Sequence, residues 1–203
     1  MGKQPGKPPS RCATKAGTGS RKHTVAAGPG GGYISGVIRI QRISTDDPLY
    51  QQEKALRQRV LLGPLGLTLE DLAREFPGVE DRFEHFVAVK EDHPAGPTVV
   101  ACALLLTPDD AADDGTRYGK VMQVATDEQM QRHGLARRLM VSIEARAFGE
   151  LGLDGLFCHA RGPAIPFYER LGWSTVGDPF TEVGIEHRRM ELQGETSTLP
   201  PPH

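Results

Sequence analysis

A polar loop that leads into an amphipathic helix is the part of the sequence best suited to chemistry. The loop follows an apolar stretch at 121–126, and the helix begins at Gly134-x-Ala136. The first turn of a helix has backbone N–H groups without intrahelical partners and a partial positive charge, so an anion such as pyrophosphate can bind there. Gly134 and Ala136 leave room for phosphate oxygens, and Gln131 can donate a hydrogen bond. Positive charge is added by Arg132, Arg137 and Arg138.

The second candidate is a tyrosine in a short helix further along the chain. The segment 163–171 is predicted to be helical and carries Tyr168, and Gly172 has the position of a C-cap. A helical tyrosine is usually a core or rim residue, but its hydroxyl is a competent proton donor if it faces a reaction centre. The loop at 127–133 is equally compatible with an ordinary helix start, so neither segment alone defines a function.

Hydrophobic periodicity predicts the elements that must position these residues. Their order is β-α-α-β-β-β-α-β-α-β-β, which mixes strands and helices without regular βαβ alternation. We therefore expect an α/β domain with a mixed sheet. The predicted strands cover 34–43, 83–89, 98–106, 121–126, 156–159, 173–176 and 181–190, and the predicted helices cover 49–62, 67–72 with Thr68 as N-cap, 134–148 and 163–171.

Length and charge divide the chain into a domain and two tails. The chain has 203 residues, and its longest apolar run, Val99–Leu106, is shorter than the roughly 20 residues of a membrane-spanning helix. The first 45 residues carry eight Lys or Arg and no acid, which leaves 16 basic against 26 acidic residues, or −10, for the rest. We expect a disordered basic tail over 1–32, a folded domain over 33–193 and a disordered tail over 194–203.

Several other activities lack their sequence signatures. Cys12, Cys102 and Cys158 are widely spaced, so reduced thiols in a cytoplasmic protein are expected rather than a disulfide framework or a zinc site. Neither His-Glu-x-x-His nor Gly-x-Ser-x-Gly occurs, and no metal is predicted. The acidic domain argues against nucleic acid as a main partner, and no membrane partner is expected, although the basic tail leaves a weak tether or a targeting role open.

Two motifs resemble those of the GNAT superfamily of acyl-CoA N-acyltransferases, and they occur in the same order and at a typical separation. Gln131-x-x-Gly134-x-Ala136 is similar to the Q/R-x-x-G-x-G/A signature of that family. Ala164-x-x-Phe167-Tyr168-Glu169-Arg170-Leu171-Gly172-Trp173 resembles its A-x-x-(F/L)-Y-E-x-L-G-(F/Y) segment. The resemblance covers residues 36–193, and the closing stretch 180–190 is similar to the end of a poorly characterised bacterial subgroup.

The resemblance implies a fold, a co-substrate and a set of binding residues. It implies a mixed, mostly antiparallel sheet of six or seven strands flanked by four helices, with acetyl-CoA as acyl donor and a primary amine as acceptor. The strand before the signature would splay from the next strand, and the backbones of Val124, Ala125 and Thr126 would pair with pantetheine in the gap. Beside Gln131, the pyrophosphate would be held by the backbone amides of Arg132, His133, Gly134, Leu135, Ala136 and Arg137.

The resemblance also implies direct attack of the amine on the thioester. The Val124 backbone N–H would face the developing oxyanion, and Tyr168 would give a proton to the departing thiolate. The general base is left open between His159, Glu182 and His187, any of which could instead be a structural hydrogen-bonding residue. A histidine titrates near neutrality and can act directly or through water.

One position departs from the family pattern. Many relatives carry Asn shortly before the tyrosine helix, where it contacts the coenzyme arm, and a gapless match puts Arg161 there. A shortened loop would instead shift His159 towards a position where relatives often have a catalytic Glu. Arg161 could reach a phosphate or an acidic substrate. Glu186 and His187 are neighbours, so only one of them can face the site from a strand.

The favoured function is therefore acetyl-CoA-dependent N-acetyl transfer. The alternative is a relative without turnover that binds acyl-CoA as a sensor. The acceptor is left open between a small amine, an amino acid, an antibiotic-like compound and a protein amine, and the protein is expected to be a monomer or a homodimer.

Overall fold

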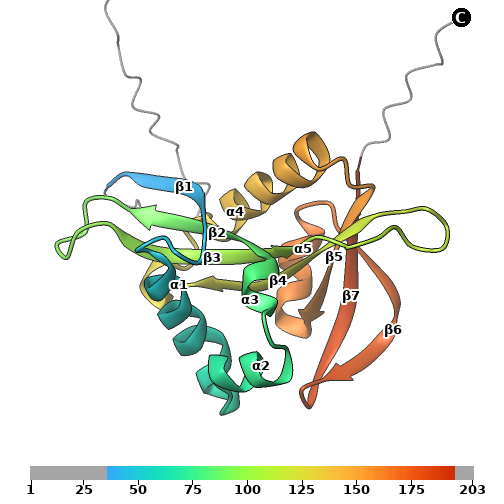
Figure 1. Cartoon of the computed structure of the whole chain (residues 1–203), viewed down its shortest axis with the longest axis horizontal. Coiled ribbons are helices and arrows are strands. Elements are labelled where there is room, and N and C mark those ends of the chain that lie inside the picture. Colours follow the sequence, from blue (N-terminus) through green and yellow to red (C-terminus); the bar gives the residue numbers. More distant parts are fainter. Residues whose placement is uncertain (1–35, 195–203) are drawn as a thin grey trace, which may run out of the picture.

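Residues 36–194 are described by a computed structural model, and they form one seven-stranded sheet with helices on both faces (Figure 1). The predicted tails, 1–32 and 194–203, lie outside the described residues except for Gly194. The strand order is β1-β2-β3-β4-β5-β7-β6, and within residues 36–194 only β4 and β5 pair in parallel. This confirms the mixed, mostly antiparallel sheet. The strands are β1 (Ile38–Ile43), β2 (Phe83–Lys90), β3 (Thr98–Leu106), β4 (Tyr118–Thr126), β5 (Gly155–Arg161), β6 (Ser174–Glu182) and β7 (Ile185–Gln193).

Helices α1 and α4 cover opposite faces of the sheet, which we call the α1 face and the α4 face (Figure 1). Helix α5 packs on the α4 face. Among residues 36–194, no helix has the length and apolar character needed to cross a membrane. The helices are α1 (Tyr50–Arg57), α2 (Leu69–Glu75), α3 (Val79–Arg82), α4 (Leu135–Glu144) and α5 (Ile165–Glu169), with π-helical turns at Gln58–Leu62 and Ala145–Glu150 and 3-10 turns at Gly63–Leu65, Glu128–Met130 and Gly162–Ala164.

Strand β3 shows why the middle of the sheet is covered on both sides. All of its residues from Val99 to Leu105 are buried. A strand buried on both faces has a continuous apolar sequence, and that is the pattern of this segment. On the α4 face, the helix α4 packs against it through one stripe of side chains at helical spacing. That stripe consists of Leu135, Leu139, Met140 and Ile143.

Helix α2 begins at the predicted cap. The Thr68 hydroxyl accepts a hydrogen bond from the Asp71 backbone N–H at 3.1 Å, and the Asp71 carboxylate accepts one from the Thr68 N–H at 3.0 Å. This reciprocal capping box satisfies two backbone donors. The next helix, α3, was not predicted, because a single polar turn over Val79–Arg82 has no apolar periodicity to reveal it.

The predicted strand over 181–190 is wrong at its start. The chain turns at Val183 and Gly184, which have φ of 51° and 71°, while Glu182 and Ile185 pair directly across the hairpin. Positive φ at both central residues is the type I′ turn of a tight hairpin. A β-branched residue strongly disfavours positive φ, so the presence of Val183 gave no indication of a turn in the sequence. Glu182 therefore ends β6 rather than lying inside β7.

Strands β4 and β5 separate beyond their first residues. They pair only where Tyr118–Lys120 faces Gly155–Phe157. Beyond that register, Val121–Thr126 of β4 stays on β3 and Cys158–Arg161 of β5 stays on β7. The carboxyl ends of the two strands point in different directions in Figure 1. In the described part of the chain, both strand ends consequently have a backbone edge without a strand partner facing the gap between them.

Candidate active site

The start of α4 lies at the end of β4 and has an exposed first turn. Its N-cap, Gly134, adopts the left-handed conformation with φ of 74°, and Arg132 does so as well with φ of 63°. The backbone N–H of Arg138 donates to the Gly134 carbonyl at 3.1 Å, which is the first bond of the helix. The preceding amides belong to the set that a helix leaves without intrahelical partners. A Cβ added at Gly134 would meet no atom within 4 Å, so the space beside this turn is open.

We expect Gly134→Ala to lower the free energy of unfolding by about 1 kcal/mol, because alanine is strained at positive φ. A matched control is Gly149→Ala, since Gly149 lies outside the left-handed region and a Cβ there also meets open space. In its helical turn, alanine should raise the free energy of unfolding by about 0.5–1 kcal/mol. Urea unfolding of both variants measures the difference. Equal effects of the two substitutions would show that the Gly134 backbone is not held in the left-handed region.

The polar side chains of this loop differ in what they contact. The Gln131 amide donates to the Thr126 carbonyl at 3.4 Å, so it lies against the end of β4. Arg138 donates to the Ile38 carbonyl of β1 at 2.9 Å and is thereby tied to the sheet. The Nδ1 atom of His133 is buried without a hydrogen-bond partner among residues 36–194. The Arg138 guanidinium therefore lies against β1, and its contribution of positive charge to the anion site stays a prediction.

Strand β4 contains a bulge where the residues expected to bind pantetheine begin. Cys102 pairs with Ala125 and Leu104 with Met122, so Gln123 and Val124 together oppose one residue of β3. Gln123 has φ of 48°, a conformation that glutamine rarely adopts. A bulge of this kind re-aims the residues that follow it. We therefore expect it to influence the direction of the Val124 backbone N–H.

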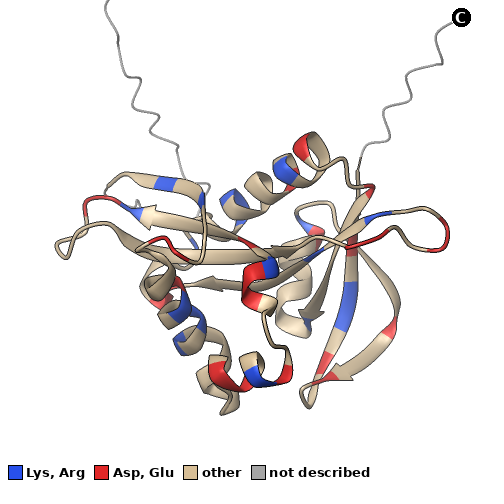
Figure 2. Ribbon diagram, in the orientation of Figure 1, with Lys and Arg blue, Asp and Glu red and all other residues tan. Residues whose placement is uncertain are grey.

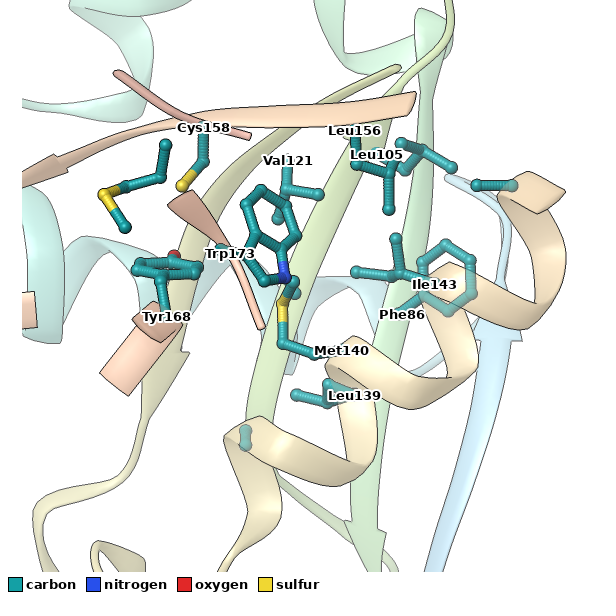
Figure 3. Packing of buried hydrophobic residues seen from close by; sticks show 14 of the residues in the cluster. Phe86, Leu105, Val121, Leu139, Met140, Ile143, Leu156, Cys158, Tyr168 and Trp173 are labelled. Atoms are coloured by element: carbon teal, nitrogen blue, oxygen red, sulfur yellow. The ribbon is translucent and has the colours of Figure 1, made fainter. Parts of the chain in front are cut away.

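Tyr168 is held by the end of its own short helix. The Trp173 N–H donates to the Tyr168 carbonyl at 3.1 Å, and Gly172 follows the helix with φ of 88°. These are features of a Schellman C-cap and confirm the predicted role of Gly172. The Tyr168 ring packs 5.3 Å from the Trp173 ring and lies beside Cys158 of β5 (Figure 3).

Burial keeps the Tyr168 hydroxyl protonated. It raises the pKa of Tyr168 well above its usual value of 10, and the neighbouring Cys158 thiol acts in the same direction. Burial likewise raises the pKa of Cys158 to about 12. Both groups are therefore neutral at pH 7. Tyr168 approaches the separated half of β5 from the α4 face, with a hydroxyl that can donate.

On the opposite face of β5, His159 forms a pair with Glu182. The His159 Nδ1 lies 3.0 Å from the Glu182 Oε2. A carboxylate only accepts hydrogen bonds, so Nδ1 carries the proton and Nε2 has the free lone pair in the neutral ring. Burial lowers the pKa of His159 below 6.5, opposed by Glu182 and assisted by Lys120 and Arg189. The ring is consequently neutral at pH 7 and can take up a proton.

His187 lies on the same face as His159. Its ring stacks on Phe180 with a centroid separation of 6.1 Å, and Phe180 meets the His159 ring edge-on at 4.8 Å. The His187 Nδ1 lies 2.8 Å from the Ile185 carbonyl, an acceptor, so Nε2 is again the free atom. His187 is buried, and strand alternation turns Glu186 to the other face.

The three candidate bases therefore lie on the α1 face of the sheet. Tyr168, from α5, packs against β5 on the α4 face. Arg161 is the last residue of β5 and is level with His187 in the register. It lies at the end of the gap, next to the turn that leads into α5. The β4 backbone of Val124–Thr126 lies across the gap, and the α4 start follows the loop after β4.

Two features of this region were missed by sequence reasoning. One is the bulge at Gln123, for which a glutamine in a strand gives no signal. The other is an aromatic and cationic group around His159, in which the Arg189 guanidinium lies 3.9 Å from the Phe157 ring centroid and the Lys120 amine 5.9 Å. Period-2 alternation along β5 puts Phe157 on the His159 face, and that signal was available.

Comparison with known proteins assigns this arrangement to a family. The model of the family described as "Acetyltransferase (GNAT) domain" matches residues 70–193. The chain belongs to the GNAT family and is an acyltransferase by class. A protein of Bacillus subtilis (strain 168), whose name proposes an acetyltransferase, is 22% identical over 160 residues, which are 79% of this chain and 99% of that protein.

Solved structures share the fold. The crystal structure of Escherichia coli ElaA superimposes with a TM-score of 0.59 at 19% identity, covering 77% of this chain and 100% of that chain. A GNAT family acetyltransferase from Elizabethkingia anophelis, solved with acetyl-CoA bound, gives a TM-score of 0.54 at 16% identity, covering 77% of this chain and 97% of that chain. At these identities the likeness shows the fold.

Proposed function

We propose that the protein transfers an acetyl group from acetyl-CoA to a primary amine by direct attack. The observation that carries this proposal is that the separated half of β5 presents His159 on one face, while Tyr168 packs against its other face beside Cys158. In this proposal Tyr168 would be the proton donor for the leaving sulfur, and His159 the proton acceptor for the amine. The family membership supports the acyl-CoA chemistry.

Acetyl-CoA would bind along the gap and the start of α4. The unpaired β4 edge at Val124–Thr126 supplies backbone N–H and C=O groups that suit the amides of the pantetheine arm. The open turn at 132–137 supplies N–H groups and the positive end of the helix for the pyrophosphate. Arg132, Arg137 and Arg161 add positive charge near these two segments.

The reaction would proceed with one proton acceptor and one proton donor. His159 Nε2 takes a proton from the incoming ammonium group, and the amine nitrogen then forms a bond to the thioester carbon. The Val124 N–H donates to the oxyanion, for which a fixed backbone donor is effective. The C–S bond breaks, and the Tyr168 hydroxyl gives its proton to the sulfur. Glu182 holds the His159 ring and stabilises its protonated form.

Calorimetry with purified protein tests the binding step. We expect acetyl-CoA and CoA to bind one molecule per chain, and the affinity to fall with added salt because charged groups meet the pyrophosphate. Dephospho-CoA and pantetheine are the comparison ligands, and pantetheine, which lacks the pyrophosphate, should bind far more weakly. Equal binding of pantetheine and CoA would contradict the assigned pyrophosphate site. Absence of any CoA binding would contradict the proposed function.

A panel of amines then tests transfer. Release of the CoA thiol should depend on one class of amine and should be accompanied by the acetylated product in mass spectra. Tight binding of acetyl-CoA with no release by small amines, amino acids or peptides would instead support a sensor of acyl-CoA.

A further inference from the structure

A group of four charged residues, three buried and one half-buried, joins α1 to α3 and β2, and the proposed reaction does not use it. It consists of Glu53 and Arg57 from α1, Glu80 from α3 and His85 from β2, and we call it the ionic network. Figure 2 shows the basic bands of α1 and the acidic bands of α3 close to each other. Glu53 and Arg57 are both 0% exposed. Charged groups are rarely removed from water so completely unless they are paired.

The hydrogen bonds of the ionic network define its charges. The Arg57 Nη2 donates to Glu80 Oε2 at 2.6 Å, and the His85 Nδ1 donates to Glu53 Oε2 at 2.9 Å. The His85 Nε2 lies 3.0 Å from the Glu80 carbonyl, which also only accepts, so both ring nitrogens carry protons. Burial alone would lower the pKa of His85, but the bond to Glu53 reverses this and raises it. The positive charges of Arg57 and His85 therefore balance the negative charges of Glu53 and Glu80.

One hydrogen bond of the ionic network joins it to the bulge of β4. The Arg57 Nη1 donates to the Gln123 Oε1 at 3.2 Å, across 66 positions of sequence. Gln123 is the bulge residue with positive φ, and Val124 follows it directly. A residue held in such a conformation needs surroundings that determine it. The Arg57 guanidinium, itself fixed by Glu80, is the group that holds the Gln123 side chain.

Stability alone does not explain a network of this kind. Burying charges removes their hydration, and apolar side chains of similar volume often stabilise a protein equally well or better. The ionic network instead fixes an orientation. The planar Arg57 guanidinium has N–H groups in a rigid geometry, and it donates to Glu80 and Gln123 at the same time. A contact with a fixed geometry is suited to holding the bulge of β4 in one conformation.

We propose that the ionic network is a positioning device that holds the β4 bulge through Gln123 and so aims the Val124 backbone N–H at the acyl carbonyl. This inference rests on the proposed acyl transfer. Gln123 and Arg57 are positioning residues, since they act through the backbone of Val124 and do not touch the substrate. The helix α1 would in this way couple one face of the sheet to the coenzyme gap.

The test compares three glutamine variants. Gln123→Met keeps the size of the side chain and removes the acceptor oxygen, whereas Gln123→Glu keeps an oxygen for Arg57. Gln51→Met makes the same change at an exposed position of α1 and serves as the control. Turnover is measured as CoA release with hydroxylamine, which is largely unprotonated at neutral pH and so bypasses the general base.

We expect Gln123→Met to lower kcat about 10- to 100-fold, as for a displaced oxyanion donor. The Kd for CoA should stay within about threefold, because the pyrophosphate turn is untouched. Gln123→Glu should recover most of the lost kcat, and Gln51→Met should behave as the wild type. Unchanged kcat in Gln123→Met, or a parallel loss of kcat, CoA affinity and Tm, would overturn the proposal.

Hydrogen exchange separates this proposal from the acyltransferase proposal. In Gln123→Met, the amides of 123–126 should exchange about tenfold faster than in the wild type at equal Tm, with or without CoA, because their local opening becomes easier. Unaltered exchange there would overturn the positioning role. If the wild type binds no CoA and releases none, the acyl-transfer function fails, and the exchange data still decide whether Gln123 holds the bulge.

Discussion

Replacing Tyr168 by Phe should lower kcat about 100-fold or more, which is the usual contribution of a positioned proton donor. The Kd for acetyl-CoA should stay within about threefold of the wild-type value. The substitution removes one hydroxyl, and the ring keeps its packing against Trp173 and Phe167. The coenzyme would be held mainly by backbone groups of β4 and α4, which the substitution does not reach. Steady-state kinetics and calorimetry on the same preparation measure the two quantities.

Tyr118→Phe is the matched control. The Tyr118 hydroxyl donates to the Gln193 side chain at 2.6 Å at the exposed start of β4, well before the gap opens. Its loss should leave kcat unchanged. If Tyr168→Phe turned over at the wild-type rate, Tyr168 would have no part in the proton transfer. If it lost CoA affinity in proportion to kcat, the hydroxyl would serve binding instead.

Replacing His159 by Gln should lower kcat/KM about 100-fold near pH 7 for an amine that is protonated in solution. It should also remove the acid limb of the pH profile. Burial holds the pKa of His159 below its ordinary value of 6.5. The neutral, proton-accepting form therefore dominates above that pKa, and activity should fall as the pH drops through it. A pH series of kcat/KM measures the position of the limb.

Glu182→Gln and His187→Gln identify which group titrates. Glu182 raises the pKa of His159, so its removal should move the acid limb to lower pH, with a smaller rate loss than His159→Gln causes. His187→Gln should leave the limb in place. If His187→Gln removed the limb and His159→Gln kept it, the base would be His187. Hydroxylamine should restore much of the activity of His159→Gln, because it needs little deprotonation.

Local patterns predicted the elements that position the site. The apolar stripe of α4, the buried run of β3 and the cap at Thr68 each depend on neighbours within a few positions, and the structure confirms them. The motif around Gly134 and the Schellman cap after Tyr168 are equally local. The two elements that were predicted wrongly also have local causes. A valine at position 183 is not typical of a hairpin turn, and the single turn of α3 is too short to show apolar periodicity.

The sequence by itself predicted the family and the order of the elements except for α3, because each of these is encoded in a short stretch of chain. It also singled out the segments that we propose bind an anion or donate a proton. Only the tertiary structure decided that Glu182 pairs with His159, that His187 rather than Glu186 shares their face, and that Arg57 reaches Gln123. These contacts join residues 23 and 66 positions apart. They depend on strand register and on a bulge, and a shift of one residue in either would turn the side chains to the opposite face of the sheet.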